Sequence, residues 1–231
     1  MPVRAVLFDF GGTLVSSLGD PRPVFAAAAE RAGVELDLDR YLRANEELWR
    51  ELWPQGPQWI GKVPSFADEV HERALRRVGA KGSLEAMVRC IREEAISPRW
   101  HVPFPESEPV LRQLRLDGRS VHLLSNNVDY LPMLLENLGW SRLFDSVTYS
   151  QEIGCVKPDR QLFQLALARA GVGPDQALHV GDSWEADVLG ASAAGIPSLW
   201  LNREHRAAPG PCKEIQTLRE LVPWIANGSR R

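Results

Sequence analysis

Helical and strand patterns alternate along the chain from Pro98 to the C-terminus, and this alternation limits the possible folds. Apolar residues at helical spacing separate short apolar runs that have the length of strands. We expect helices over 110–116, 130–138, 161–170, 186–194 and 218–225, and strands over 3–9, 120–124, 146–149, 177–180 and 198–201. Strands joined by helices pair in parallel, so the sequence predicts an α/β fold: a doubly wound, Rossmann-like parallel sheet with helices on both faces.

The segment from about residue 22 to residue 96 has helical patterns only. Helices are expected over 25–32, 38–52, 66–78 and 84–94. Helices with no strand between them predict a small bundle inserted after the first strand. We therefore expect an α/β core from residues 1–15 and 101–231, and a helical cap from residues 16–100. The linkers near 16–23 and 96–105 are rich in Pro, Gly or Ser, and they would form a hinge that closes the cap over a site.

Composition indicates a globular protein rather than a nucleic-acid or membrane protein. The net charge is −3 and the pI is near 6.0, which gives no support for nucleic-acid binding. The sequence has neither a signal peptide nor an apolar run long enough to span a membrane. Its three cysteines show no metal-ligand spacing, so we expect reduced thiols and a cytoplasmic location. The oligomeric state and the identity of the substrate stay open.

Asp9 ends the first apolar run, and it is followed by Gly11, Gly12 and Thr13. A buried carboxylate without a partner costs several kcal/mol, so this acid is a poor core residue. It is well placed as a nucleophile or metal ligand, because ligands bind at the carboxyl ends of strands in open α/β sheets. The glycines allow a sharp turn and a close approach of the backbone to a ligand. Thr13 is either a turn residue or a contributor to the pocket.

Polar residues also follow three later strands. They are Ser125–Asn126, Lys157, and the segment from Gly181 to Asp187 that contains Asp182. Strand ends in a parallel sheet converge on one crevice, so these residues are expected to meet Asp9. Carboxylates this close need a counter-ion.

The charges of such a pocket can be counted. Asp9, Asp182 and Asp187 contribute about −3, and Lys157 returns +1. A divalent cation would bring the pocket near neutrality, and carboxylate ligands without His or Cys favour Mg²⁺ over Zn²⁺. Ser125 and Lys157 would hold phosphate oxygens. Attack by a carboxylate on phosphorus would then give an acyl-phosphate intermediate.

With these motifs in this order, the chain resembles the haloacid dehalogenase-like hydrolase superfamily over nearly its whole length, and the helical insertion resembles that family's α-helical cap. The motifs are Asp9–Thr13, Ser125–Asn126, Lys157–Pro158 and Gly181–Asp187. The resemblance implies that Asp9 is the nucleophile and that Lys157 stabilises it and the transferring group. Asp182, helped by Asp187, would hold Mg²⁺ together with Asp9 and the backbone carbonyl of Gly11. The implied substrate-binding residues are Gly11, Gly12, Thr13, Ser125, Asn126 and Lys157.

The chain departs from the family pattern at Gly11. Phosphatases of this family usually carry there a second aspartate that acts as general acid and base, which is worth roughly 10²–10⁴-fold in rate. Activity on alkyl phosphates would then be low, or the substrate would have a leaving group that needs no proton. Alternatively another residue donates the proton, with Asn127, Asp129 or a cap residue as candidates.

We expect a Mg²⁺-dependent phosphatase that acts on a small phosphorylated metabolite. One alternative is a metal-free 2-haloacid dehalogenase, which would use Arg40 to take the halide. Another is a weak or inactive relative that acts as a binding protein.

In the cap, the spacing of Trp49 predicts a core residue, whereas Trp53 and Trp59 flank a Pro/Gly break that is typical of a substrate-facing loop.

Overall fold

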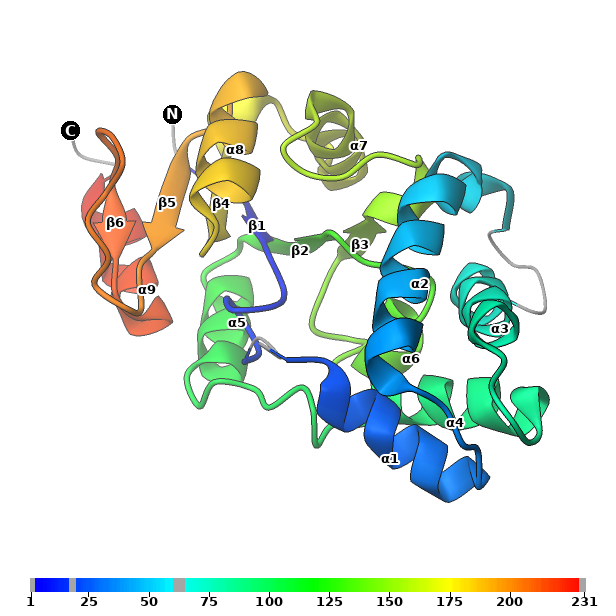
Figure 1. Cartoon of the computed structure of the whole chain (residues 1–231). Helices are drawn as coiled ribbons and strands as arrows, with labels where there is room; N and C mark the ends of the chain where they lie inside the picture. The colour runs from blue at the N-terminus through cyan, green and yellow to red at the C-terminus, as the bar shows by residue number, and fades with distance from the viewer. Residues whose placement is uncertain (1–2, 17–19, 60–64, 229–231) are drawn as a thin grey trace.

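The computed structural model describes residues 3–16, 20–59 and 65–228, and its centre is a parallel sheet of six strands (Figure 1). The strands are β1 (Ala5–Phe8), β2 (Ser120–Ser125), β3 (Ser146–Tyr149), β4 (Ala177–Gly181), β5 (Ser198–Leu201) and β6 (Glu214–Ile215). Their order is β3-β2-β1-β4-β5-β6, so the order reverses direction at β1. In register, Phe8 pairs with Leu123 of β2 and with Val180 of β4. The polar segments that follow these strands therefore start at one edge of the sheet, beside the switch point.

Helices cover both faces of the sheet, which confirms the expected α/β fold. One face carries α5 (Ser107–Leu116), α6 (Leu131–Asn137) and α9 (Leu221–Gly228), and the other carries α7 (Arg160–Ala170) and α8 (Gly190–Ala193) (Figure 1). Successive side chains of β1 pack into hydrophobic cores on opposite faces of the sheet. Val6 and Phe8 pack with α5, α6 and α9, whereas Leu7 packs with α7 and α8. This is the period-two alternation of a strand that is buried on both faces.

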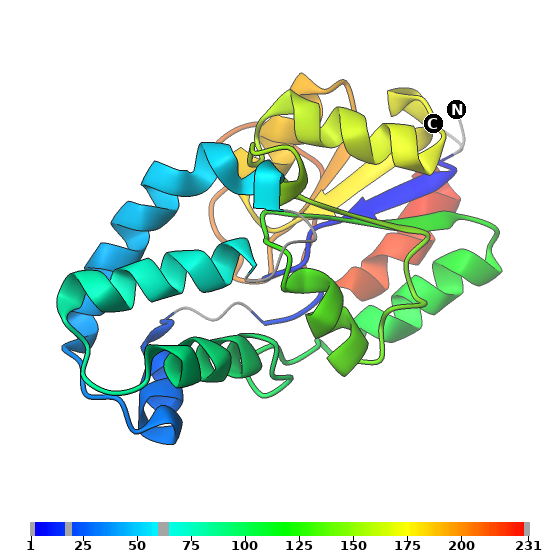
Figure 2. The ribbon, with the colours of Figure 1, turned by 90° about the vertical axis from the view of Figure 1, so that its right-hand side faces the viewer.

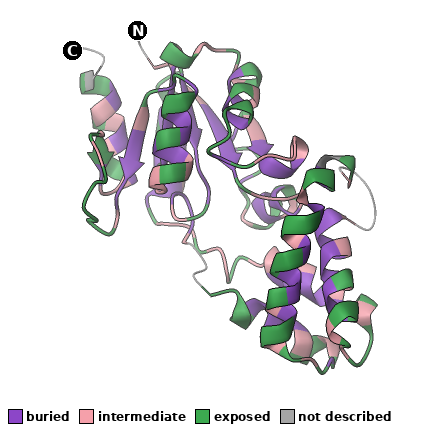
Figure 3. Ribbon diagram, turned by 45° about the horizontal axis from the view of Figure 1, so that its top comes forward, coloured by how far each residue is buried: buried purple, intermediate pink, exposed green. Residues whose placement is uncertain are grey.

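Four helices follow β1 and lie beside the end of the sheet to which β1 points (Figure 2). They are α1 (Arg22–Ala32), α2 (Leu38–Leu52), α3 (Phe66–Val78) and α4 (Leu84–Ala95). Their apolar faces share a core of their own, which includes Tyr41, Phe66 and Ile91 and is separate from the buried strands (Figure 3). Asp37, Ser65 and Ser83 cap three of these helices through backbone N–H groups. These observations support the proposed division into a core and a cap at residues 16 and 100.

The two chain segments that join the helical insertion to the sheet run side by side. The N–H of Ser16 donates to the carbonyl of Val102 at 2.8 Å, and Val15 forms an antiparallel bridge with Pro103. A second contact lies farther along, where the hydroxyl of Tyr130 donates to a carboxylate oxygen of Asp68 at 2.7 Å. The expected hinge at these linkers stays a prediction, and residues 17–19 of the first linker lie outside the described residues.

The structure differs from the expected elements after β4. The helix expected over 186–194 is divided into a π-helical turn, η4 (Trp184–Leu189), and α8. Within this wider turn, the side chain of Asp187 accepts a hydrogen bond from the backbone N–H of Ser183 at 3.0 Å. The two-residue strand β6 is too short to show a period in the sequence. Short 3₁₀ turns complete the chain: η1 (Trp53–Trp59), η2 (Ser150–Glu152), η3 (Pro174–Gln176) and η5 (Leu218–Glu220). Among the described helices, none is both long and apolar enough to cross a lipid bilayer.

Candidate active site

Asp9 lies directly after β1, and its backbone N–H still donates to the carbonyl of Val180 at 2.9 Å. Its side chain is nearly buried, and one carboxylate oxygen accepts a hydrogen bond from Nζ of Lys157 at 2.6 Å. Burial, with smaller contributions from Asp187 and Asp182, raises the pKa of Asp9 to about 6 against the opposing effect of Lys157. The position of this acid therefore makes its ionised form less favourable than in a free carboxyl group, and further positive charge would offset that.

Lys157 joins two of the acids. Its Nζ lies 2.6 Å from an oxygen of Asp9 and 2.6 Å from an oxygen of Asp187. Burial alone would lower the pKa of Lys157, but the two carboxylates raise it above its ordinary value. Asn126 fixes the backbone at this point, because its side-chain amide accepts from the N–H of Lys157 at 2.7 Å and donates to its carbonyl at 3.2 Å. The ammonium is thus held as a fixed charge.

Asp187 is the most fully bonded acid of the group. One oxygen accepts from Lys157 and from Nε2 of His179, which is 2.9 Å away, and the other accepts from the N–H of Ser183. Burial would raise its pKa, but Lys157 and His179 lower it below the ordinary range. Asp182 has fewer partners: the hydroxyl of Thr13 donates to it at 3.3 Å, and burial and Asp187 raise its pKa.

One carboxylate oxygen from each of Asp9, Asp182 and Asp187 lies within 4.8 Å of the others. If all three acids are ionised, they and Lys157 carry a net charge of about −2. Lys157 offsets one of these three negative charges, and burial together with the neighbouring acids holds the pKa of Asp9 and of Asp182 above the ordinary value. A hard divalent cation fits both the charge and the all-oxygen donor set.

Two glycines allow the acids to approach the backbone this closely. Gly12 has a φ of +78°, and a Cβ placed on it would lie 2.4 Å from a carboxylate oxygen of Asp182. A Cβ on Gly181 would lie 2.2 Å from the carboxyl carbon of Asp187. Any larger residue at either position would push an acid out of the cluster.

The acids open into a pocket of about 450 Å³. Lys157, Gly11, Ser125 and Asn126 also line it, so the pocket gathers residues from the ends of β1 and β2 and from the loop after β3. Thr13 and Gly12 are not among the described lining residues. Their carbonyls instead accept hydrogen bonds from Arg203 at 2.9 and 3.3 Å. Their expected substrate contacts, like the other site roles, stay predictions.

Sequence reasoning missed three residues of this region. His179 lies inside the buried strand β4, where a side chain is expected only to pack, but it bonds Asp187. Arg203 holds the turn after Asp9 and is itself paired with Glu106 at 2.7 Å. His101 lines the pocket from the segment that follows α4. No motif marks the two histidines, although a polar residue inside a buried strand was an available signal for His179.

Three other candidate residues can be placed. Arg40, which a dehalogenase would need, is exposed in the first turn of α2 and is not among the described residues that line the pocket. Asn127 lines the pocket, but an amide has no acidic proton to give. Asp129 is not among the described lining residues, and its backbone N–H bonds the side chain of Gln151 at 2.9 Å.

Comparison with known proteins places this site in a wider group. A model of the haloacid dehalogenase-like hydrolase family matches residues 3–195. Phosphoserine phosphatase of Thermus thermophilus is 30% identical, and the match covers 95% of this chain and 98% of that protein. Glyceraldehyde 3-phosphate phosphatase of Methanopyrus kandleri is 31% identical over 87% of this chain and 84% of that protein. Among solved structures, 2-haloacid dehalogenase of Pseudomonas syringae shares the fold, with a TM-score of 0.73 at 24% identity, covering 98% and 99% of the two chains.

Proposed function

The chain belongs to the haloacid dehalogenase-like hydrolase family, and we propose that it is a Mg²⁺-dependent phosphatase of a small phosphorylated metabolite. The observation that carries this proposal is the cluster of Asp9, Asp182 and Asp187 oxygens within 4.8 Å, with Nζ of Lys157 bonded to two of these acids. Both phosphatases described above act, by their names, on phosphate esters, which supports the same substrate class for this chain. Membership of the family was expected from the motifs and is confirmed.

The proposed reaction starts at Asp9. Its carboxylate attacks phosphorus, and the bond to the leaving oxygen breaks to give an aspartyl phosphate. Water then attacks the phosphorus, which releases inorganic phosphate and restores the carboxylate. Ser125, at the end of β2 and on the pocket wall, would donate to a phosphoryl oxygen. Lys157 would orient Asp9 and stabilise the charge on the transferring group.

The proposed Mg²⁺ would be held by Asp9, Asp182 and the carbonyl of Gly11, with Asp187 assisting. The donor set fits, because it consists of hard oxygens with a net charge that a divalent cation offsets. When bound, the ion would screen the negative charges of the nucleophile and the phosphate from each other. Asp187 already accepts three hydrogen bonds. We therefore assign it mainly a positioning role, in which it holds Lys157 and the turn at Ser183 in place.

The dehalogenase alternative loses its halide-binding residue, because Arg40 is exposed rather than on the wall of the Asp9 pocket.

The three cysteines, Cys90, Cys155 and Cys212, are all free thiols, which supports the further proposal of a cytoplasmic location.

Release of inorganic phosphate and of halide can be measured with the same purified protein. We expect phosphate release from phosphate esters with Mg²⁺, loss of that release with EDTA, and no halide release from 2-haloacids. Halide release without metal would replace this proposal by the dehalogenase, and release of neither product would support the binding protein.

A further inference from the structure

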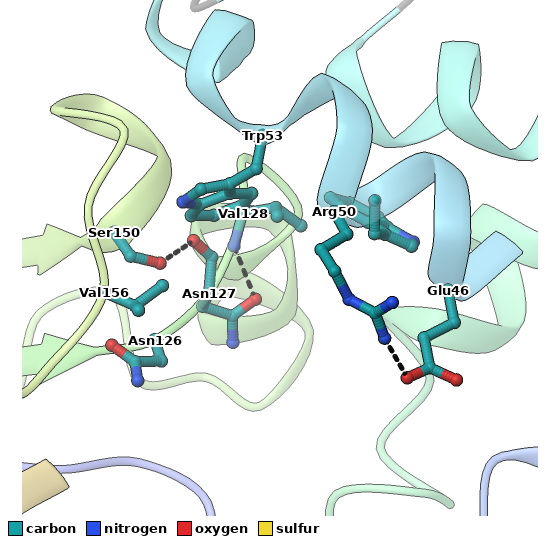
Figure 4. Close-up of a pocket in the computed structure, with 9 residues that line it drawn as sticks. Glu46, Arg50, Trp53, Asn126, Asn127, Val128, Ser150 and Val156 are labelled. Carbon is teal, nitrogen blue, oxygen red and sulfur yellow. Dashed lines mark hydrogen bonds and ion pairs between the residues drawn. The ribbon is translucent and has the colours of Figure 1, made fainter.

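Figure 4 shows a second pocket, which has a volume of about 540 Å³. Asn126 and Asn127 line both pockets, so a ligand can extend from one into the other. One wall comes from the end of α2 and the start of η1, and the other comes from the loops that follow β2 and β3. We call it the Trp53 pocket, after the apolar residues Trp49, Trp53, Val128 and Val156 that line it.

The apolar wall of the Trp53 pocket is rigid and open. The rings of Trp49 and Trp53 lie 6.2 Å apart, and both pack edge-on against Phe66, at 5.1 and 6.0 Å between centroids. Such contacts hold the indole rings as flat surfaces. Across from Trp53, Val156 is 43% exposed, which is unusual for a large apolar residue of this protein, and it directly precedes Lys157. A ligand that covers these side chains would remove apolar area from water.

The Trp53 pocket carries no net charge. Its two charged residues, Glu46 and Arg50, form an ion pair at 2.7 Å, and both side chains are more than two-thirds exposed at the rim (Figure 4). The neighbouring carboxylate site would take the phosphate in the proposed reaction, once the proposed Mg²⁺ offsets its negative charge. A ligand that fits both pockets therefore carries its phosphate beside Lys157 and is uncharged and flat at the other end.

The carboxylate site has no evident acid for a leaving oxygen. Gly11 stands where the aspartate would be, and Asp9, Asp182, Asp187 and Lys157 belong to the charged cluster. His101 is the other titratable residue on the described wall, and its Nε2 lies 2.8 Å from the carbonyl of Ala95, which can only accept. Burial lowers the pKa of His101, so its ring is unprotonated at neutral pH. A phenol ionises near pH 10, far more readily than an alkyl alcohol, and leaves without help from an acid.

We propose that the substrate is an aryl phosphate, in which an uncharged aromatic ring occupies the Trp53 pocket and a phenolic oxygen carries the phosphate beside Asp9. This inference rests on the proposed phosphatase function and narrows its substrate class. An oxygen of Asp9 bonds to phosphorus as the bond from phosphorus to the phenolic oxygen breaks. The phenolate leaves with the electron pair and takes a proton from water. A second water then attacks phosphorus, so that inorganic phosphate departs and the carboxylate is restored.

The first test compares 1-naphthyl phosphate with glycerol phosphate, both with Mg²⁺. We expect the native protein to have the higher kcat/KM for the naphthyl ester. Trp53→Ala should raise KM for the naphthyl ester by about tenfold and leave KM for glycerol phosphate unchanged, because only the naphthyl ring contacts the indole. Val156→Thr, which keeps the side-chain shape, should raise the same KM by about threefold. Trp224→Ala is the matched control, since Trp224 packs against the sheet core in α9 and should leave both values unchanged.

The second test restores the missing acid. Gly11 is exposed and, unlike Gly12, does not have a positive φ, so its backbone conformation accepts a side chain. Gly11→Asp should raise kcat for glycerol phosphate by about 10²-fold or more and change kcat for the naphthyl ester by less than about threefold.

Three outcomes overturn the aryl phosphate inference alone. The first is a preference of the native protein for glycerol phosphate, and the second is an equal loss of kcat/KM for both esters in Trp53→Ala and Val156→Thr. The third is an equal rise of kcat for both esters in Gly11→Asp, because the phenolic oxygen would then need the acid. Failure to hydrolyse either ester overturns the phosphatase proposal and this inference with it.

Discussion

The carboxylate site and the Trp53 pocket adjoin each other but are built in opposite ways. In the carboxylate site, Asp9 and Asp187 are buried, and both are bonded to the buried ammonium of Lys157. In the Trp53 pocket the charged pair is exposed at the rim, and the wall consists of indole rings and valines. Hydrogen bonds fix atoms to within tenths of an ångström, whereas apolar contact tolerates many shapes. In the proposed function, the chemistry would reside at the core strand ends, and the choice of substrate body would depend on the Trp53 pocket, which the cap and the core loops form together.

The largest difference is expected for the nucleophile. Asp9→Asn should lower kcat on the order of 10⁴-fold or more for aryl and alkyl phosphates alike, because the proposed reaction uses the Asp9 carboxylate as its nucleophile for both. Trp53→Ala should change KM for the aryl ester alone. Initial rates measured with both esters over a range of concentrations give kcat and KM separately and check this contrast. A variant Asp9→Asn that keeps a tenth of the native kcat would mean that the core does not supply the nucleophile.

The free energy of unfolding should also depend more on the charged pair of the carboxylate site than on that of the Trp53 pocket. Asp187→Asn breaks a buried ion pair with Lys157 and weakens the bonds to His179 and Ser183. We expect the free energy of unfolding to fall by about 3 kcal/mol. Glu46→Gln breaks the exposed pair with Arg50 and should change it by less than about 0.5 kcal/mol. Urea unfolding of both variants measures this, and equal losses would contradict the contrast.

Two glycines with positive φ provide a matched pair for metal binding. A Cβ on Gly12 would collide with Asp182, whereas a Cβ on Gly33, at the end of α1, would meet no atom within 4 Å. Both alanine variants carry the strain of a positive φ, about 1 kcal/mol. Only Gly12→Ala should also weaken Mg²⁺ binding, by about 10–100-fold. Calorimetric titration with Mg²⁺ distinguishes them, and an unchanged affinity in Gly12→Ala would remove Asp182 from the proposed ligand set.

The smallest expected effect is a dependence of stability on pH, which arises from Asp9 in the carboxylate site and not from the Trp53 pocket. The pKa of Asp9 rises from 3.8 to about 6 on folding, so the folded, metal-free protein holds this proton more tightly than the unfolded chain. Its contribution to stability is therefore present at low pH and is lost as the pH rises from about 4 to 6. Metal ligands must be deprotonated, so Mg²⁺ should raise Tm more at about pH 7.5 than at about pH 5. Equal shifts at both pH values would exclude Asp9 as a ligand.

The sequence allowed the core to be predicted more fully than the pocket wall. Asp9 and Asp182 were expected to converge because parallel strands end at one edge, and the structure brings them together. The strand over 146–149 and the helix over 66–78 have the expected bounds, since local apolar patterns determine both. The π-helical turn η4 and the role of His179 depend on contacts with Asp187, and no spacing rule encodes them.

The Trp53 pocket depends on how the cap sits against the sheet. Val128 and Val156 have no motif, and they become pocket residues only because Trp53 faces them across the gap (Figure 4). Trp53 was expected to face the substrate and does line this pocket. Trp49 was expected in the cap core; it packs against that core and lines the pocket as well.

The most direct test of the central claim is the mass of the Asp9 peptide after acid quench of the enzyme during turnover of an aryl phosphate with Mg²⁺. An aspartyl phosphate formed at this residue adds one phosphoryl group to the peptide that contains Asp9. The same quench of Asp9→Asn should show no added mass. Turnover that leaves every peptide without a phosphoryl group, or that places the group on another residue, would contradict the proposed role of Asp9.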